Sequence, residues 1–151
     1  MEYAIHSDNL QTLVSATLAL IDDFVVVLDE ESQALIDVNR DKVTELQDKK
    51  VAMGRAYYEA MMALGDKQDE LKATDGETKG RITAAYKKIQ KSFDKNIKAL
   101  NAARDVAERV QNIIVNAAKR AVAHDSPNYN ATGYAGPSQD TAVHFQVSET
   151  V

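Results

Sequence analysis

The sequence contains no cysteine and no tryptophan, only two prolines and six glycines, and 6% aromatic residues. Without cysteine the chain can form neither disulfide bonds nor cysteine-ligated metal sites. Because both prolines lie after residue 126, nothing before that point forbids long helices. Alanine and lysine are frequent, which favours helix over sheet, and a length of 151 residues suits one domain.

The usual marks of secretion and of membrane insertion are also missing. Residues 1–6 contain no basic region and no apolar core follows them, so we expect no secretory signal. The most apolar stretch, Leu10 to Leu28, is interrupted by Asp22 and Asp23, which disfavours a membrane span. Together with the lack of cysteine, these features predict a cytoplasmic protein without membrane insertion.

Basic residues are absent from both ends of the chain. Residues 1–38 hold eight acidic residues and no lysine or arginine, whereas residues 81–120 hold ten basic and three acidic residues. A basic segment of this kind can bind nucleic acid. The whole chain has a net charge of −5, however, and we expect the basic segment to lie against the acidic first segment. We therefore predict no nucleic-acid partner.

The sequence shows no pattern for catalysis or phosphate binding. Gly76 and Gly80 neither follow a strand nor precede the Lys-Ser/Thr pair of a phosphate-binding loop. The histidines are not spaced as metal ligands; they are His6, His124 and His144. The run from Asp29 to Glu31 could hold a divalent ion, but such clusters more often form a solvated face. We predict a protein that is not an enzyme and has no metal and no cofactor.

What the sequence does contain is an apolar stripe from Ile82 to Ala121, with steps that alternate between four and three residues. Its members are Ile82, Tyr86, Ile89, Phe93, Asn96, Leu100, Ala103, Ala107, Val110, Ile114, Ala117 and Ala121. A sustained heptad stripe needs partner helices to cover it. Asn96 is the polar member, and a core asparagine usually fixes the register of packed helices.

Two earlier segments have the same helical spacing. The first, about residues 8–37, can be capped by Ser7 or Asp8. The second, about residues 40–72, follows a turn expected near Asp37 to Asp41, where the residues are polar and weak helix formers. No Gly or Pro marks this break, so one helix continuous through residues 36–40 is the alternative. Its stripe includes Lys50 and Lys67, whose stems can lie on apolar surface while their charges reach water.

Two glycines separate the second helix from the third, so residues 73–80 are expected to form a loop, with Asp75 or Thr78 as the cap. The third helix is then expected over about residues 79–123, and turn-forming residues follow it. The pattern predicts an all-α fold: an elongated antiparallel three-helix bundle or coiled coil in residues 1–124, with a flexible C-terminal tail in residues 125–151.

Three groups of residues could bind a partner protein. A soft patch on the second helix could be either core or an adaptable surface; it consists of Met53, Tyr57, Tyr58, Met61 and Met62. The late part of the third helix has a widened apolar arc that could receive a partner helix; it consists of Val106, Val110, Ile113, Ile114 and Val115. In the tail, aromatic anchors in a polar segment, Tyr129 to Tyr134, could form a recognition element or be incidental.

Several segments also match a known family in their order and spacing. They are Glu31-x-x-Ala34-Leu35, Asp37, Leu46, Lys49-Lys50, Asn96 to Val110, the Tyr-x-x-x-Gly turn from Tyr129 to Gly133, and Val143 to Val147. In these segments the chain resembles the FlgN-type flagellar export chaperones, including the related α-proteobacterial forms.

The resemblance implies a cytoplasmic helical chaperone that brings hook-associated (hook–filament junction) proteins to the flagellar type III export apparatus. It implies that the substrate's C-terminal helices pack against the late third helix, at Val106, Val110, Ile113, Ile114 and Val115. It also implies docking at the export gate through the tail, at Tyr129, Gly133 and Tyr134. A structural coiled-coil protein that self-assembles into a homo-oligomer through the same stripes is the alternative.

Overall fold

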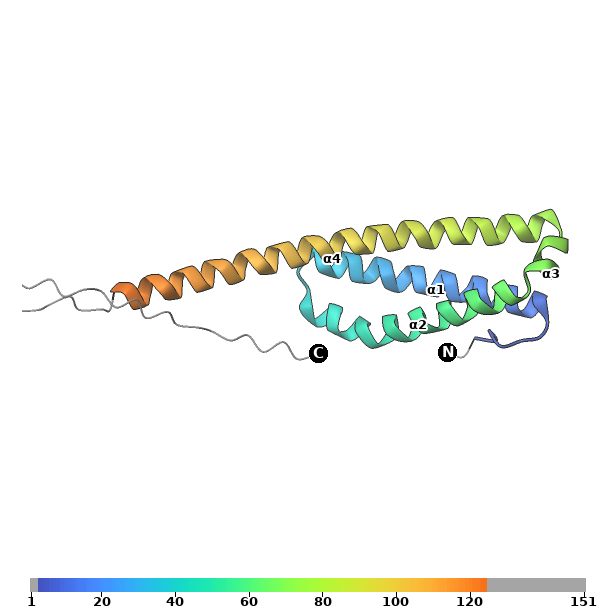
Figure 1. Ribbon diagram of the computed structural model, residues 1–151, viewed down its shortest axis with the longest axis horizontal. Helices are drawn as coiled ribbons and strands as arrows, with labels where there is room; N and C mark the ends of the chain where they lie inside the picture. The colour runs from blue at the N-terminus through green and yellow to red at the C-terminus, as the bar shows by residue number, and fades with distance from the viewer. Residues whose placement is uncertain (1–2, 125–151) are drawn as a thin grey trace, which may run out of the picture. The chain divides into compact units, whose positions relative to one another are not determined.

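The computed structural model describes residues 3–124, and helices make up most of this part of the chain (Figure 1). The helices are α1 (Leu10–Ile36), α2 (Arg40–Asp66), the short α3 (Gln68–Ala73) and α4 (Gly76–His124). No strand occurs in these residues, so the predicted all-α class is confirmed. The chain divides into two compact units, of which the first ends at Asn112 and the second begins at Ile113 within α4.

α1 supplies most of the core of the first unit. Its fully covered side chains include Leu13, Leu20 and Leu28, which lie among apolar residues of α2 and Ile89 of α4. By length and composition alone α1 could cross a membrane, with a mean hydropathy of 1.7 over its most apolar window. A helix covered by its neighbours needs the same apolar composition, and α1 has such neighbours here.

The directions of the helices follow from which residues meet. Asp22 accepts a hydrogen bond from Lys88 at 2.7 Å and Asp29 accepts one from Lys95 at 3.3 Å, and in both pairs the residues are 66 positions apart. A constant separation means that α1 and α4 run parallel, and α2 runs antiparallel to them (Figure 1). These ion pairs confirm that the basic segment lies against the acidic first segment.

The helix ends differ in detail from the sequence prediction. Asn9, rather than Ser7 or Asp8, caps α1, and its Oδ1 accepts a hydrogen bond from the backbone N–H of Thr12 at 3.0 Å. The helix expected to run to residue 72 is interrupted at Lys67, where α2 ends and the single turn of α3 follows. Backbone hydrogen bonds continue on both sides of this break. The N–H of Lys67 donates to the carbonyl of Leu64, and the N–H of Leu71 donates to the carbonyl of Lys67.

The loop predicted for residues 73–80 is wrong, because α4 already begins at Gly76. Asp75 supplies the cap: its Oδ1 accepts from the backbone N–H of Thr78 at 2.7 Å and its Oδ2 from the Thr78 hydroxyl at 2.8 Å. These hydrogen bonds lower the pKa of the Asp75 carboxyl, because they favour its charged form. A strong cap therefore outweighs the low helix propensity of the two glycines.

The turn between α1 and α2 lies where the sequence predicts it, at residues 37–39. The N–H of Val38 donates to the carbonyl of Leu35, and the N–H of Asn39 donates to that of Ala34 at 2.8 Å. This pair of bonds is the Schellman motif, which needs a left-handed residue at its centre. That residue is Val38, with φ of 56°, a conformation that a β-branched residue adopts at a cost.

Replacing Val38 by glycine is therefore expected to stabilise the protein by about 1 kcal/mol. The side chain is 73% exposed, so its removal takes no packing from the core. Glycine relieves the strain, and its greater freedom in the unfolded chain offsets part of the gain. Urea unfolding followed by circular dichroism measures the change. Val51→Gly, in the interior of α2, is the matched control and should lose about 0.5 kcal/mol, because valine is already a weaker helix former than alanine; a loss in both variants would contradict the strain argument.

Candidate functional site

Three helices of the first unit meet in a group of polar side chains, which we call the polar cluster: the buried Glu31, Ser32 and Asn96, the half-buried Lys50 and the exposed Gln47. Glu31 is 0% exposed, and its Oε2 accepts from the Lys50 ammonium at 2.6 Å and from the Asn96 amide at 2.6 Å. Its Oε1 accepts from the Gln47 amide at 2.7 Å. Among the described residues no buried side-chain polar atom lacks a partner.

The polar cluster bears on the sequence expectations for Glu31, Lys50 and Asn96. Glu31 does not belong to a solvated face, since it is enclosed, and Lys50 forms an ion pair with it instead of only extending along apolar surface. No group of three potential ligands in residues 3–124 could hold a metal ion. Asn96 joins α4 to Glu31 and Ser32 of α1 and to Lys50 of α2, contacts that suit a residue that sets helix register.

Next to the polar cluster lies an aromatic cluster with one ring from each long helix. The rings of Phe24 and Phe93 are 5.5 Å apart in an edge-to-face arrangement, and Tyr57 lies 6.1 Å from Phe24 and 5.9 Å from Phe93. Burial, with a smaller contribution from Tyr86, raises the pKa of the Tyr57 hydroxyl. These contacts anchor α4 to the other two helices.

The soft patch on α2 is divided between two faces. Met53 is buried, and Tyr57 and Met61 pack against the core, so this half is core. Tyr58 and Met62 are exposed. Of the five residues of the soft patch, only Tyr58 and Met62 are therefore available for an adaptable binding surface.

The constant separation of 66 residues between paired positions of α1 and α4 also shows where α1 stops covering α4. At a separation of 66 residues, the last residue of α1, Ile36, corresponds to Ala102. Ala103 is half-buried, and every later residue of α4 is exposed. Within the first unit, residues 104–112 thus continue a helix whose neighbours have ended.

The residues predicted to bind a substrate protein lie on this uncovered part of α4. Val106 and Val110 belong to the first unit, and Ile113, Ile114 and Val115 belong to the second. Their exposed fractions lie between 42% and 67%, although each is a large apolar side chain. The predicted docking residues Tyr129, Gly133 and Tyr134, and the predicted tail itself, lie outside the described residues.

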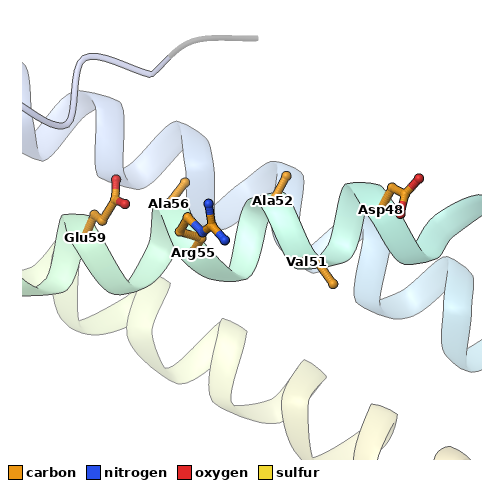
Figure 2. A pocket seen from close by; sticks show the side chains of 6 residues that line it. All are labelled: Asp48, Val51, Ala52, Arg55, Ala56 and Glu59. Atoms are coloured by element: carbon orange, nitrogen blue, oxygen red, sulfur yellow. The ribbon is translucent and has the colours of Figure 1, made fainter. Parts of the chain in front are cut away.

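Three surface depressions lie on the described part of the first unit. One, about 430 Å³, is lined by six side chains of α2 alone, and Figure 2 shows them spread along one helix from Asp48 to Glu59. A depression on a single helix has no opposite wall. A second, about 230 Å³, is apolar and lies where α1, α2 and α4 meet, at residues that include Leu18, Met61 and Tyr86.

A third depression, about 270 Å³, lies beside the N-terminal segment. The hydroxyl of Tyr3 donates to Asp23 of α1 at 2.5 Å, and burial together with this carboxylate raises the pKa of Tyr3 to about 12. Lys49, Met53 and Ala56 of α2 complete the lining. One aspartate already bonded to a tyrosine does not form a catalytic arrangement, so this depression adds no chemistry.

Comparisons with known proteins leave the chain without an assigned relative: no family model, no curated protein and no solved structure matches it. The uncovered part of α4 is an apolar, basic helix surface, and such a surface can bind another helix. Sequence reasoning found this surface but missed the polar cluster.

Proposed function

We propose that this chain binds helices of a partner protein along the uncovered part of α4, as a cytoplasmic chaperone without enzymatic activity. The proposed partners are flagellar hook-associated proteins, which the chaperone would deliver to the export gate of the type III export apparatus. The resemblance in sequence motivates this identity of the partners. The exposure of the predicted binding residues on α4 supports the mode of binding.

One observation carries the proposal: the covered and the uncovered residues of α4 belong to one heptad stripe. In the first unit Ile89 and Asn96 are buried in this stripe, and Val110 continues it two heptads after Asn96 as an exposed residue. From Ile82 to Ala103 the neighbouring helices bury or partly cover every stripe residue except Tyr86, which is 52% exposed. Beyond Ala103 the stripe keeps the pattern of a seam, but among the described residues no helix covers it.

In this interpretation α1, α2 and the first part of α4 form a three-helix bundle or coiled coil that holds α4 in place. Each of the three contributes a ring to the aromatic cluster and a side chain to the polar cluster. Within the first unit, residues 104–112 of α4 are exposed beyond the residue that corresponds to the end of α1. A partner helix would then occupy the place along α4 that α1 or α2 occupies earlier.

A self-assembling coiled-coil protein is the second candidate, because the same stripe could pair with a copy of itself. A nucleic-acid binder is a weaker candidate. Lys88 and Lys95, from the middle of the basic segment, are already paired with carboxylates of α1. Retention on DNA at low salt, with a steep loss as salt rises, would reopen that function.

Ile114→Asp is expected to abolish partner binding without unfolding the protein. The side chain is exposed, so the carboxylate costs the folded chain little, but a partner helix would have to desolvate it. Co-expression with a hook-associated protein, followed by size-exclusion chromatography with light scattering, measures the complex. Val51→Asp, at a similarly exposed position of α2, is the matched control and should leave the complex intact.

The same experiment separates the candidates. A complex of defined mass that Ile114→Asp alone disrupts supports the chaperone. Homopolymers that form without any added protein would contradict it and favour self-assembly. A complex that survives Ile114→Asp, in a variant with wild-type circular dichroism, would place the binding surface elsewhere.

A further inference from the structure

Basic residues flank the stripe of α4 on the side that faces α1. Lys88 and Lys95 are seven residues apart, and each directly precedes a buried stripe residue, Ile89 or Asn96. Each pairs with an aspartate of α1 at the same separation of 66 residues. The same arrangement therefore occurs twice: a lysine that directly precedes a buried stripe residue of α4 forms an ion pair with an aspartate of the parallel helix α1.

Arg109 repeats this position beyond the end of α1. It lies two heptads after Lys95 and directly precedes Val110 of the stripe. Among residues 3–124, no acidic side chain forms an ion pair with Arg109; the nearby Glu108 pairs instead with Arg104 at 2.9 Å. Arg109 is exposed, as are Val106 and Val110 beside it in the helix.

The charge of this region argues against a second α4 as the occupant. From Lys98 to His124 the helix carries five basic residues and two acidic residues, so two such segments would repel each other. In a parallel pair, Arg109 would also face Arg109. An acidic helix avoids both costs, and the net charge of −8 on residues 1–38 shows that α4 already packs beside such a helix in the first unit.

We propose that the partner of α4 is an acidic amphipathic helix that runs parallel to α4, as α1 does, and places a carboxylate on Arg109. The inference rests on the proposed function, because it specifies the partner of the same surface. Apolar contacts with Val106 and Val110 supply the burial. Arg109 is the residue that selects the charge, register and direction of the helix, in the way that flanking charges do in coiled coils.

Two peptides with the sequence of residues 16–36 of α1 test the selection on the full chain, since a parallel helix with Asp22 opposite Arg109 then begins opposite Ala103, where the cover by α1 ends. One keeps Asp22 and Asp29, and the other carries lysine at both positions. Fluorescence anisotropy should show that the acidic peptide binds the wild-type chain at least tenfold more tightly than the lysine peptide. Arg109→Glu should reverse the preference and Arg109→Lys should preserve it, while Arg55→Glu on α2 is a control that should change nothing.

Direction is tested separately, because the chain has no cysteine of its own. An acidic peptide with an added N-terminal cysteine should form a disulfide with Ala102→Cys and not with Asn116→Cys; the opposite result would overturn the parallel direction. Equal binding of the acidic and lysine peptides would overturn selection by Arg109. Binding of neither peptide would overturn the acidic-helix partner. The proposed function is measured independently by the complex with a hook-associated protein, so the two can fail separately.

Discussion

Lys50→Met is expected to lower the free energy of unfolding by about 3 kcal/mol, because it leaves the charge of Glu31 buried without its cation. The Glu31 side chain is 0% exposed, so water cannot replace the ammonium. Gln47 and Asn96 would still donate to the carboxylate, but amides do not neutralise its charge. Urea unfolding followed by circular dichroism measures the loss.

A surface ion pair provides the matched control. Lys88→Met removes the partner of Asp22, but both side chains are more than half exposed and the expected loss is below about 1 kcal/mol. Similar losses in the free energy of unfolding for the two variants would mean that the burial of Glu31 does not increase the cost of removing its cation. A loss confined to Lys50→Met would show that burial determines the size of the effect.

Replacing the whole charged core of the cluster extends the same argument. The triple variant Glu31→Leu, Lys50→Met, Asn96→Leu is expected to recover most of the stability lost in Lys50→Met, because no polar group is left unsatisfied. We expect the triple variant to lose uniqueness, since apolar residues allow α4 to shift by a turn against α1. Broadened amide resonances of α4 would reveal such exchange; a single sharp spectrum would show that the polar cluster does not set register.

The sequence predicts the helices well where one side of a segment is apolar. Periodicity identifies all three long helices, and polar residues predict the first turn near Asp37 to Asp41, a range that contains the turn observed at residues 37–39. The second connection is predicted too long, because the hydrogen bonds of Asp75 to Thr78 start α4 before Gly80. Propensity alone cannot weigh one strong cap against two glycines, because the cap depends on the geometry of the chain that precedes it.

The candidate site likewise has one part that the sequence predicts, the exposed part of α4, and one part that it does not, the buried Glu31. Within the first unit, exposure of Val106 and Val110 follows from helix lengths, since α4 continues past Ala102, which corresponds to the last residue of α1. The burial of Glu31 could not be read from its neighbours, because Asp29 and Glu30 are only partly covered or exposed. The signal that could have revealed it is the combination of Glu31, Lys50 and Asn96 at stripe positions on three different helices, where three polar groups can satisfy one another.

Phe24→Ala is expected to cost about 3–5 kcal/mol, the usual range when a buried phenylalanine is truncated. Phe24 is 3% exposed, and its ring contacts Tyr57 of α2 and Phe93 of α4. Its ring also lies over Gly54, where an added Cβ would be 3.8 Å from the ring edge. Truncation therefore empties a space bordered by three helices, which cannot easily collapse.

Phe24→Leu is the control for volume, and about 1 kcal/mol of loss is expected because most of the space stays filled. Truncation of the exposed Tyr86 to alanine should cost less than either. Unfolding in urea compares the three variants. Equal losses for Phe24→Ala and Tyr86→Ala would contradict the assignment of the aromatic cluster as the anchor of α4.

Amide hydrogen exchange shows which part of α4 is destabilised in Phe24→Ala. The polar cluster remains in Phe24→Ala, so we expect amides near Phe93 to lose more protection than those near Asn96. Amides of Ile113 to His124, which have no buried neighbours in the wild type, should exchange as before. If the folded variant also binds the acidic peptide with wild-type affinity, packing within the bundle and recognition by α4 are energetically separate, as expected for a binding surface that begins where the cover of α4 ends.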